Sequence, residues 1–259
     1  MTAPAFLALD PGLAGLGAGD RYHLSGGEGR HAAKVARIGV GEEVLLTDAT
    51  GAQVLTRVVA AAKETLDVEL LEAPRPAPPR RPRLALIQAL ATGGRDEQAV
   101  ESATELGADR ITPWIADRSV SVWRAEKLRK GQAKWTATVH AAVKQCRRPG
   151  IPAVDAAITS QQLPAEVRER ITAGGLVLVL HEQESTPLVG LLAELRESQD
   201  DREEITVIVG PEGGISEPEL AALREAGARS VLLGPDVLRS STAGPAAIAV
   251  LSALLGRWG

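Results

Sequence analysis

Residues 74–83 read PRPAPPRRPR, with five prolines in ten positions. Proline fixes the φ angle and lacks a backbone N–H group, so this stretch cannot continue a helix or lie in a central strand. We therefore expect a semi-rigid spacer between a domain at residues 1–73 and a domain at residues 84–259. No internal repeat is visible in either part.

The part before the spacer has the pattern of a small β domain. Residues 43–48, 53–60 and 65–71 are short runs rich in apolar and β-branched side chains, and a turn-like Ala-Thr-Gly at 49–51 separates the first two. Such runs favour a small antiparallel sheet or barrel. About seventy residues suffice for one compact β module.

After the spacer, apolar strand patterns alternate with longer amphipathic stretches. That alternation is typical of an α/β fold, a parallel sheet with helices on both faces. The predicted strands are 84–90, 110–114, 176–181, 206–209 and 231–233, and the predicted helices are 96–106, 124–145, 188–197, 218–226 and 242–255. Gly107 predicts a helix C-terminus, and Ser216 with Glu219 predicts a capping box. Gly244-Pro245 is expected to interrupt the start of the last helix.

Composition excludes several classes of protein. The chain is 44% hydrophobic and 24% charged, and no apolar run reaches the roughly 18 residues of a membrane-spanning helix. The N-terminal sequence lacks a signal-peptide pattern, so we expect a cytoplasmic protein. One cysteine and four scattered histidines have no usual zinc spacing, and we expect no metal. A phosphate-binding loop of nucleotide hydrolases is also missing.

Charge is distributed unevenly along the chain, although the net charge is −4. Residues 84–150 hold 11 basic and 7 acidic side chains, whereas residues 151–259 hold 8 and 16. Between Arg118 and Arg148, nine basic residues accompany a single acid, Glu126. A polyanion responds to such a local field, so this segment could bind nucleic acid. A solvated helix face explains a charge run equally well.

Three predicted strands end in polar or glycine-containing tips. The most informative is GPEGG at residues 210–214, which follows a buried-type strand; the others are Leu-His-Glu at 180–182 and Leu-Leu-Gly-Pro at 232–235. Open α/β sheets bind ligands at the carboxyl ends of their strands, and paired glycines let backbone N–H groups approach a ligand. The three tips could therefore form one pocket. A tight connection without a ligand is the alternative for each tip alone.

The order and spacing of the last motifs are specific. GPEGG at 210–214, Leu-Leu-Gly-Pro at 232–235, Leu238-Arg239 and Thr242-Ala243 resemble the C-terminal signature of the bacterial small-subunit ribosomal RNA uridine-N3 methyltransferases, which belong to the SPOUT superfamily of knotted methyltransferases. Upstream, the stretches 105–107, 111–113, 118–119 and 142–148 resemble the same family, and the β module fits its N-terminal PUA-like domain.

This resemblance implies a fold, a cofactor and an assembly. The fold is α/β, with a PUA-like β-barrel before a trefoil-knotted parallel sheet, a rare exception to the rule against knots. The cofactor is S-adenosyl-L-methionine, and the assembly is a homodimer with the pocket at the subunit interface. The cofactor-binding residues that it implies are Leu180, His181, Glu182, Gly210, Pro211, Glu212, Gly213, Gly214, Leu232, Leu233, Gly234, Leu238, Ser240, Thr242 and Ala243.

The reaction implied is methylation of N3 of a specific uridine in 16S ribosomal RNA. Arg239 is our candidate catalytic residue, because its donors could neutralise charge on the uracil carbonyl oxygens as N3 loses its proton. A surface arginine paired with Asp236 or Glu212 is the alternative. Glu212 and His181 are the titratable residues nearest the implied pocket, and neither is assigned as the general base.

RNA contact is expected from the basic segment and the β module. Only six aromatic residues occur, so phosphate contacts should outweigh base stacking. Of Trp123 and Trp135, at least one is expected to pack in the core. The RNA-binding candidates are Arg118, Arg124, Lys144, Gln145, Arg147 and Arg148.

This chain departs from the family at one informative place. Where the family commonly has Leu-Arg-Thr-Glu-Thr, the sequence after Arg239 is Ser240-Ser241-Thr242, so a role of that glutamate does not carry over.

Two alternative functions stay open: a SPOUT enzyme that methylates the ribose 2′-hydroxyl, and a non-catalytic RNA-binding ribosome assembly factor. Cofactor binding would separate the second alternative from both enzymes. The acidic C-terminal region favours assembled small ribosomal subunits over naked RNA.

Overall fold

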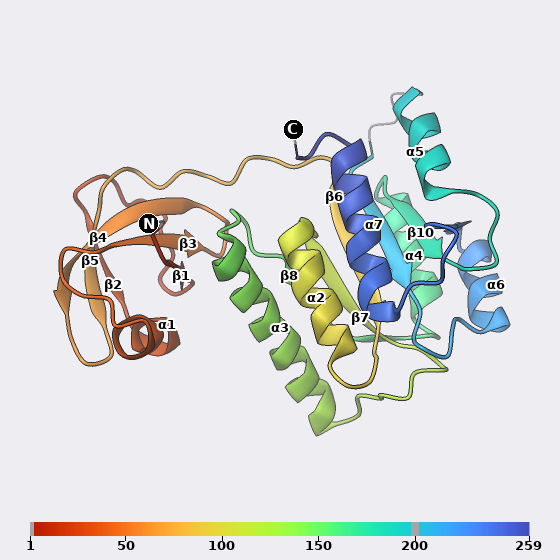
Figure 1. The fold of residues 1–259 in the computed structure, drawn as a ribbon, viewed down its shortest axis with the longest axis horizontal. Helices are drawn as coiled ribbons and strands as arrows, with labels where there is room; N and C mark the ends of the chain where they lie inside the picture. The colour runs from red at the N-terminus through yellow and green to blue at the C-terminus, as the bar shows by residue number, and fades with distance from the viewer. Residues whose placement is uncertain (1–2, 198–201, 259) are drawn as a thin grey trace. The chain divides into compact units, whose positions relative to one another are not determined.

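A computed structural model describes residues 3–197 and 202–258. The chain divides into two compact units (Figure 1). The first comprises residues up to Pro79 together with His140–Ile151, and the second comprises Arg80–Val139 together with the residues from Pro152 onward. The sequence-based division at 74–83 had assigned 140–151 to the second domain, whereas the structure groups this stretch with the first unit.

The first unit is built on a curled five-stranded sheet. Its strands are β1 (Ala5–Ala8), β2 (Arg21–Leu24), β3 (Glu43–Asp48), β4 (Gln53–Ala61) and β5 (Leu66–Leu70). They are ordered β1-β3-β4-β5-β2, and only β1 and β3 pair in parallel. A short helix α1 (Gly26–Arg30) and a π-helical turn (His31–Val35) follow β2. The predicted β module is confirmed as a half-barrel with β1 and β2 at its edges.

The second unit contains a seven-stranded parallel sheet. Its strands are β6 (Arg83–Ala89), β7 (Arg110–Ile115), β8 (Ala153–Val154), β9 (Ile158–Thr159), β10 (Leu176–Leu180), β11 (Glu204–Val209) and β12 (Arg229–Val231). The order is β12-β10-β11-β6-β7-β8, and β9 also pairs with β7. Strands buried on both faces read as continuous apolar runs, as β6, β10 and β11 do. The predicted parallel sheet is confirmed.

Helices cover both faces of this sheet. They are α2 (Arg95–Leu106), α3 (Glu126–Cys146), α4 (Leu163–Thr172), α5 (Leu188–Glu197), α6 (Glu217–Glu225) and α7 (Ser240–Leu254). Ile87 of β6 belongs to a core cluster with residues of α4 and α6, whereas its neighbour Leu86 lies against α7. Successive side chains of a strand point to opposite faces, so α4 and α6 lie on one face and α7 on the other. α2 packs against α7 and β6.

Two helix boundaries follow the predicted mechanisms. Gly107 ends α2 with a left-handed φ of 112°, and Ser216 and Glu219 form the capping box of α6.

The expectation that Gly244-Pro245 interrupts the last helix is wrong, because α7 runs from Ser240 through Pro245. A Cβ at residue 244 would lie 2.9 Å from a methyl group of Leu86, so glycine lets α7 pack closely on β6. Proline removes one backbone hydrogen bond from the helix without ending it here.

A buried ion-pair network joins α4 to the sheet. The side chain of Arg170 is 3% exposed. It donates hydrogen bonds to Glu166 at 2.8 Å, to Glu204 at 3.1 Å and to Thr112 at 2.8 Å. These partners lie on α4, β11 and β7, so one side chain holds three elements together.

Replacing this arginine should unfold the protein more easily. Arg170→Met leaves buried carboxylates without their partner, and we expect the free energy of unfolding to fall by about 3–5 kcal/mol. Arg168→Met is the matched control, because Arg168 is an exposed arginine of the same helix, and it should change stability by less than about 0.5 kcal/mol. Urea denaturation measures both variants. Equal stabilities of the two variants would contradict the network's role.

Candidate functional site

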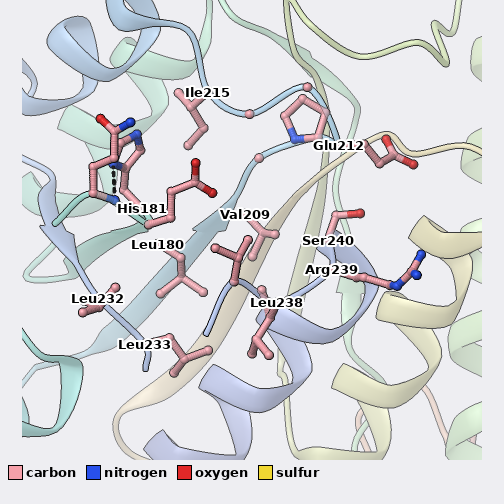
Figure 2. A pocket seen from close by; sticks show the side chains of 18 of the residues that line it. Leu180, His181, Val209, Glu212, Ile215, Leu232, Leu233, Leu238, Arg239 and Ser240 are labelled. Atoms are coloured by element: carbon pink, nitrogen blue, oxygen red, sulfur yellow. Dashed lines mark hydrogen bonds between the residues drawn. The ribbon is translucent and has the colours of Figure 1, made fainter. Parts of the chain in front are cut away.

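The carboxyl ends of β10, β11 and β12 surround a cavity of about 560 Å³. Most of its wall comes from residues 180–183 at the end of β10, 209–215 at the end of β11 and most of 232–243 after β12 (Figure 2). These three strands are neighbours and parallel, so the segments that follow them emerge at the same edge of the sheet.

The structure brings almost all of the predicted site residues to this cavity. Those on its wall are Leu180, His181, Glu182, Gly210, Pro211, Glu212, Gly213, Gly214, Leu232, Leu233, Gly234, Leu238, Arg239, Ser240 and Ala243. Thr242 is exposed on α7 and does not line the cavity. The wall also contains residues outside the predicted cofactor set, namely Arg95, Arg118, Gln183, Val209, Ile215, Glu217, Asp236 and Val237.

Arg95 could have been found from the sequence. It follows Gly93-Gly94, which come shortly after the predicted strand at 84–90. The same pattern, a strand followed by paired glycines, predicts the ligand-binding turn at 210–214. The other additional wall residues are neighbours in sequence of predicted ones, except for Arg118, which was predicted for RNA contact.

The turn at 210–214 needs its glycines for two close approaches. A Cβ on Gly210 would lie 2.6 Å from a side-chain carbon of Ile215, and a Cβ on Gly213 would lie 3.0 Å from the backbone oxygen of Arg118. Gly214 has a φ of +73°, which side chains rarely adopt. The guanidinium of Arg118 donates to the Gly213 carbonyl at 3.3 Å. The turn therefore presents its backbone to the cavity.

Glu212 ties this turn to the connection between β6 and α2. Its carboxylate accepts hydrogen bonds from the Thr92 N–H at 3.0 Å and from the Arg95 guanidinium at 3.1 Å. Burial alone would raise the pKa of Glu212, but the hydrogen bonds from Thr92 and Arg95 hold this pKa below its ordinary value. A carboxylate with a lowered pKa is a weak base, so Glu212 is better suited to positioning than to proton removal.

Arg239 is the N-cap residue of α7 and is exposed at the cavity wall. Within residues 3–197 and 202–258, its guanidinium makes no hydrogen bond or ion pair. The alternative pairing with Asp236 or Glu212 is therefore not seen there. His181, at the end of β10, accepts a hydrogen bond from the Gln183 N–H through Nδ1 at 3.4 Å (Figure 2).

A second carboxylate near the cavity, that of Glu219, is buried. Glu219 is 6% exposed and accepts hydrogen bonds from the N–H groups of Ser216 at 2.8 Å and Asp117 at 2.9 Å and from the Ser160 hydroxyl at 2.5 Å. Burial would raise the pKa of Glu219, but these hydrogen bonds lower it below its ordinary value. The carboxylate thereby fixes the loop that carries Arg118 against the start of α6.

The RNA-binding candidates of the second unit lie on its surface. Arg118 and Arg124 are exposed. Trp135 of α3 is fully buried and contacts Trp123 edge-to-face at 5.5 Å, which confirms the expected core packing. Gly131 makes room for the Trp123 ring, since a Cβ there would lie 2.3 Å from it.

The remaining candidates lie in the first unit and differ in exposure. Gln145 and Arg147 are exposed. Lys144 donates to Glu28 at 2.7 Å and its side chain is only 17% exposed, while Arg148 is 7% exposed. Lys144 is thus paired within this unit and Arg148 is buried, which leaves Gln145 and Arg147 as the exposed positions.

The described ranges contain no cluster of three or more histidine, cysteine, aspartate or glutamate side chains that could hold a metal ion. In the same ranges, no helix is both long enough and apolar enough to cross a lipid bilayer.

Comparison with known proteins identifies the family. A family model described as RNA methyltransferase domain matches residues 78–252, and one described as RNA methyltransferase PUA domain matches residues 24–71. The chain belongs to this RNA methyltransferase family. The predicted family and enzyme class are confirmed.

Similar proteins extend over nearly the whole chain. The ribosomal RNA small subunit methyltransferase E of Mycobacterium bovis is 41% identical over 91% of this chain and 87% of that protein. A solved ribosomal RNA small subunit methyltransferase E from Neisseria gonorrhoeae, bound to S-adenosyl methionine, is 27% identical with a TM-score of 0.82 over 98% of both chains. A Legionella pneumophila structure with bound cofactor SAM is 26% identical with a TM-score of 0.82 over 98% of both. The predicted fold class is confirmed, and the expected cofactor is the ligand of both solved relatives.

Glu219 should stabilise the protein in a pH-dependent way. Because its pKa is lowered in the folded state, its contribution is present above the unfolded-state pKa and is lost as the pH falls through the folded-state pKa. Glu219→Gln should cost about 1–2 kcal/mol of unfolding free energy at pH 7. This difference from the unmodified protein should shrink as the pH falls from about 5 through the lowered folded-state pKa of Glu219.

Chemical denaturation over that pH range measures the effect. Glu217→Gln is the matched control, because Glu217 is an exposed acid in the same first turn of α6. A cost for Glu219→Gln that stays constant over the whole range would contradict the ionised role of this carboxylate.

Proposed function

We propose that this protein uses S-adenosyl-L-methionine to methylate N3 of a uridine in 16S ribosomal RNA, within the small ribosomal subunit. The observation that carries the proposal is the guanidinium of Arg239, which lies at the wall of a cofactor-sized cavity and has no partner in the described ranges. Relatives named ribosomal RNA small subunit methyltransferase E support the choice of RNA. A ribosomal substrate would place the enzyme in the cytoplasm.

The cavity fits the cofactor in size and lining. Its volume of about 560 Å³ lies within the roughly 300–1,000 Å³ of small-molecule sites. Apolar side chains such as Leu180, Leu232 and Leu238 suit an adenine ring. The N–H groups of Leu233 and Gly234, which have no acceptor in the described ranges, suit polar groups. When bound there, the cofactor supplies a methyl group on a positively charged sulfur.

The residues of the chain would then act mainly by positioning and by charge. Methyl transfer to N3 requires loss of the N3 proton, which leaves negative charge on the flanking carbonyl oxygens. Arg239 can donate two hydrogen bonds to such oxygens, and nothing in the described ranges competes for them. Glu212 positions the turn and Arg95, because its partner Thr92 lies on the connection before α2 and its partner Arg95 is the first residue of α2.

RNA affinity would come from exposed arginines of the same unit. Arg118 lines the cavity and Arg124 follows it in the basic segment, so a bound RNA strand could pass from this segment to the cavity. Phosphate contacts are the expected source of affinity, because arginine binds phosphate oxygens strongly and without regard to sequence.

We propose in addition that the protein acts as a homodimer. Val237 at the cavity and Trp258 beyond α7 are 74% and 55% exposed, and large exposed apolar side chains are typical of surfaces that another chain covers. A second copy that covers Val237 would also enclose the cavity, because Val237 lies on its wall.

The activity can be tested with small ribosomal subunits that lack the modification. Incubation with labelled S-adenosyl-L-methionine should give 3-methyluridine, identified by mass spectrometry of the nucleosides. Arg239→Ala should reduce kcat about 10²–10³-fold, because it removes charge stabilisation in the transition state. Cofactor affinity, measured by calorimetry, should change little.

Arg168→Ala controls for loss of an exposed arginine away from the cavity. A 2′-O-methyl nucleoside would move the protein to the ribose-modifying enzymes. Cofactor binding without any methylated product would favour a non-catalytic RNA-binding role.

RNA binding makes a separate prediction. Arg124→Gln should weaken binding of small-subunit RNA and reduce the slope of log affinity against log salt concentration by about 0.7–1, because one phosphate contact is lost. Filter binding at several salt concentrations measures this slope. Arg168→Gln should leave the slope unchanged, and an identical slope for Arg124→Gln would exclude it from the RNA surface.

A further inference from the structure

The connection between β7 and α3 exposes apolar side chains next to basic ones. Val120 is 78% exposed and Val122 is 36% exposed, and Leu128 in the first turns of α3 is 38% exposed. Arg118 and Arg124, on either side of the two valines in sequence, are exposed as well. A single exposed apolar side chain needs no explanation, but several close together with a charged surround are typical of a binding surface.

The start of this connection is held firmly to the rest of the unit. Ser119 is 8% exposed, its hydroxyl donates to the Leu90 carbonyl at 3.0 Å, and its N–H donates to the Ala116 carbonyl at 3.0 Å. The N–H of Asp117 donates to the buried carboxylate of Glu219 at 2.9 Å. The residue just before Val120 is therefore fixed in place.

The far end of the connection is fixed by aromatic packing. Trp123 contacts the fully buried Trp135 edge-to-face, with the ring centroids 5.5 Å apart. Val120 and Val122 thus lie between two anchored points, and neither can turn into the core without breaking these contacts. A surface that is already ordered loses little conformational freedom when it binds a partner.

The charge of this surface selects the partner. The acid in the segment, Glu126, is paired with Lys130 at 2.9 Å. Within residues 3–197 and 202–258, the side chains of Arg124, Lys127 and Arg129 make no ion pair. The surface therefore keeps its positive charge, which is complementary to a polyanion such as RNA.

The position of the surface relates it to the cavity. Arg118 lines the cavity, and the backbone of Val120 lies within about 7 Å of it, because two residues of extended chain span no more. N3 lies on the pairing edge of uracil, so a base-paired uridine cannot offer N3 to the cavity. The surface that leads to the cavity should therefore suit a strand whose bases are unpaired.

We propose that residues 118–124 bind an unpaired RNA strand, in which Val120 and Val122 pack against bases while Arg118 and Arg124 bind phosphates. This inference rests on the proposed function, and it adds that the methylated uridine lies in an unpaired stretch. Every base has an apolar face, so such contacts tolerate any sequence. In a double helix these faces are stacked on one another and are not available.

Binding of two RNA probes tests the surface. The probes are a short oligouridylate and the same strand paired with oligoadenylate, each measured by filter binding at several salt concentrations. Val120→Ser should weaken binding of the single strand about three- to tenfold at every salt concentration, because an apolar contact is lost. The slope of log affinity against log salt should not change, because no phosphate contact is lost. Binding of the duplex should not change either.

Two further variants serve as controls. Val189→Ser removes a 52% exposed valine from α5 in the same unit and should leave both probes unaffected. Val120→Ile keeps an apolar side chain and should bind the single strand as the unmodified protein does. In the methylation assay with small subunits, Val120→Ser should raise KM for the subunit by a similar factor, with kcat and cofactor affinity nearly unchanged.

Several results would overturn the proposal. Failure of the unmodified protein to prefer the single strand, or an equal effect of Val120→Ser on both probes, would exclude contact with unpaired bases. Unchanged RNA binding by Val120→Ser together with a change in oligomeric state, measured by light scattering, would assign the surface to a second copy of the chain.

Failure of the proposed function gives a different pattern. Absence of 3-methyluridine with the unmodified protein, while single-strand binding still depends on Val120, would overturn the reaction and leave the strand-binding surface. Formation of 3-methyluridine with binding that is independent of Val120 would overturn this inference alone.

Discussion

The cavity depends on the parallel pairing of β11, β10 and β12, because parallel neighbours end at one edge of a sheet. Segments far apart in sequence thereby form a single wall. In the turn after β11, a Cβ atom at residue 210 would clash with Ile215, and one at residue 213 would lie very close to Arg118. Gly210 and Gly213 avoid both contacts. The sheet sets where the cavity lies, and the glycines make backbone groups part of its surface.

Carboxylates and basic groups have opposite roles around this cavity. Glu212 and Glu219 both accept several hydrogen bonds from neighbouring loops, and both have pKa values below the ordinary one. Their charges are satisfied within the protein and hold the turns in place. Arg239 and the donors of the α7 first turn have no such partners in the described ranges. These unsatisfied donors suit the proposed substrate, a uracil base that gains negative charge as N3 loses its proton.

The sequence predicted those parts of the molecule whose signals are local. Strands buried on both faces appear as apolar runs, and capping residues mark helix ends, so most elements of the second unit were predicted closely. α4 was missed, because its buried positions include Arg170, a residue type that is normally exposed and whose partners are distant in sequence. The four-residue strands β1 and β2 are too short to show a sequence pattern, and their formation depends on pairing with other strands.

Site residues were predicted less well where a tertiary contact decides their role. Lys144 is a surface-type residue in a basic segment, but in the structure it pairs with Glu28, which the sequence does not show. Thr242 was implied by a motif, yet helical periodicity turns it away from the wall that Arg239, Ser240 and Ala243 share.

Two helices begin at this cavity, and they begin differently. α6 has a complete capping box, in which Ser216 and Glu219 satisfy each other's backbone donors. α7 has no side-chain cap and no acidic residue in its first turn, and within residues 3–197 and 202–258 its buried Ser240 hydroxyl has no partner. An uncapped helix end typically costs about 1 kcal/mol, so the difference is unfavourable for stability alone. Unfavourable local features of this kind are concentrated at functional sites, where binding compensates for them. The two helix ends at one cavity therefore differ in charge, because the first turn of α7 keeps its partial positive charge while that of α6 is neutralised by Glu217 and Glu219.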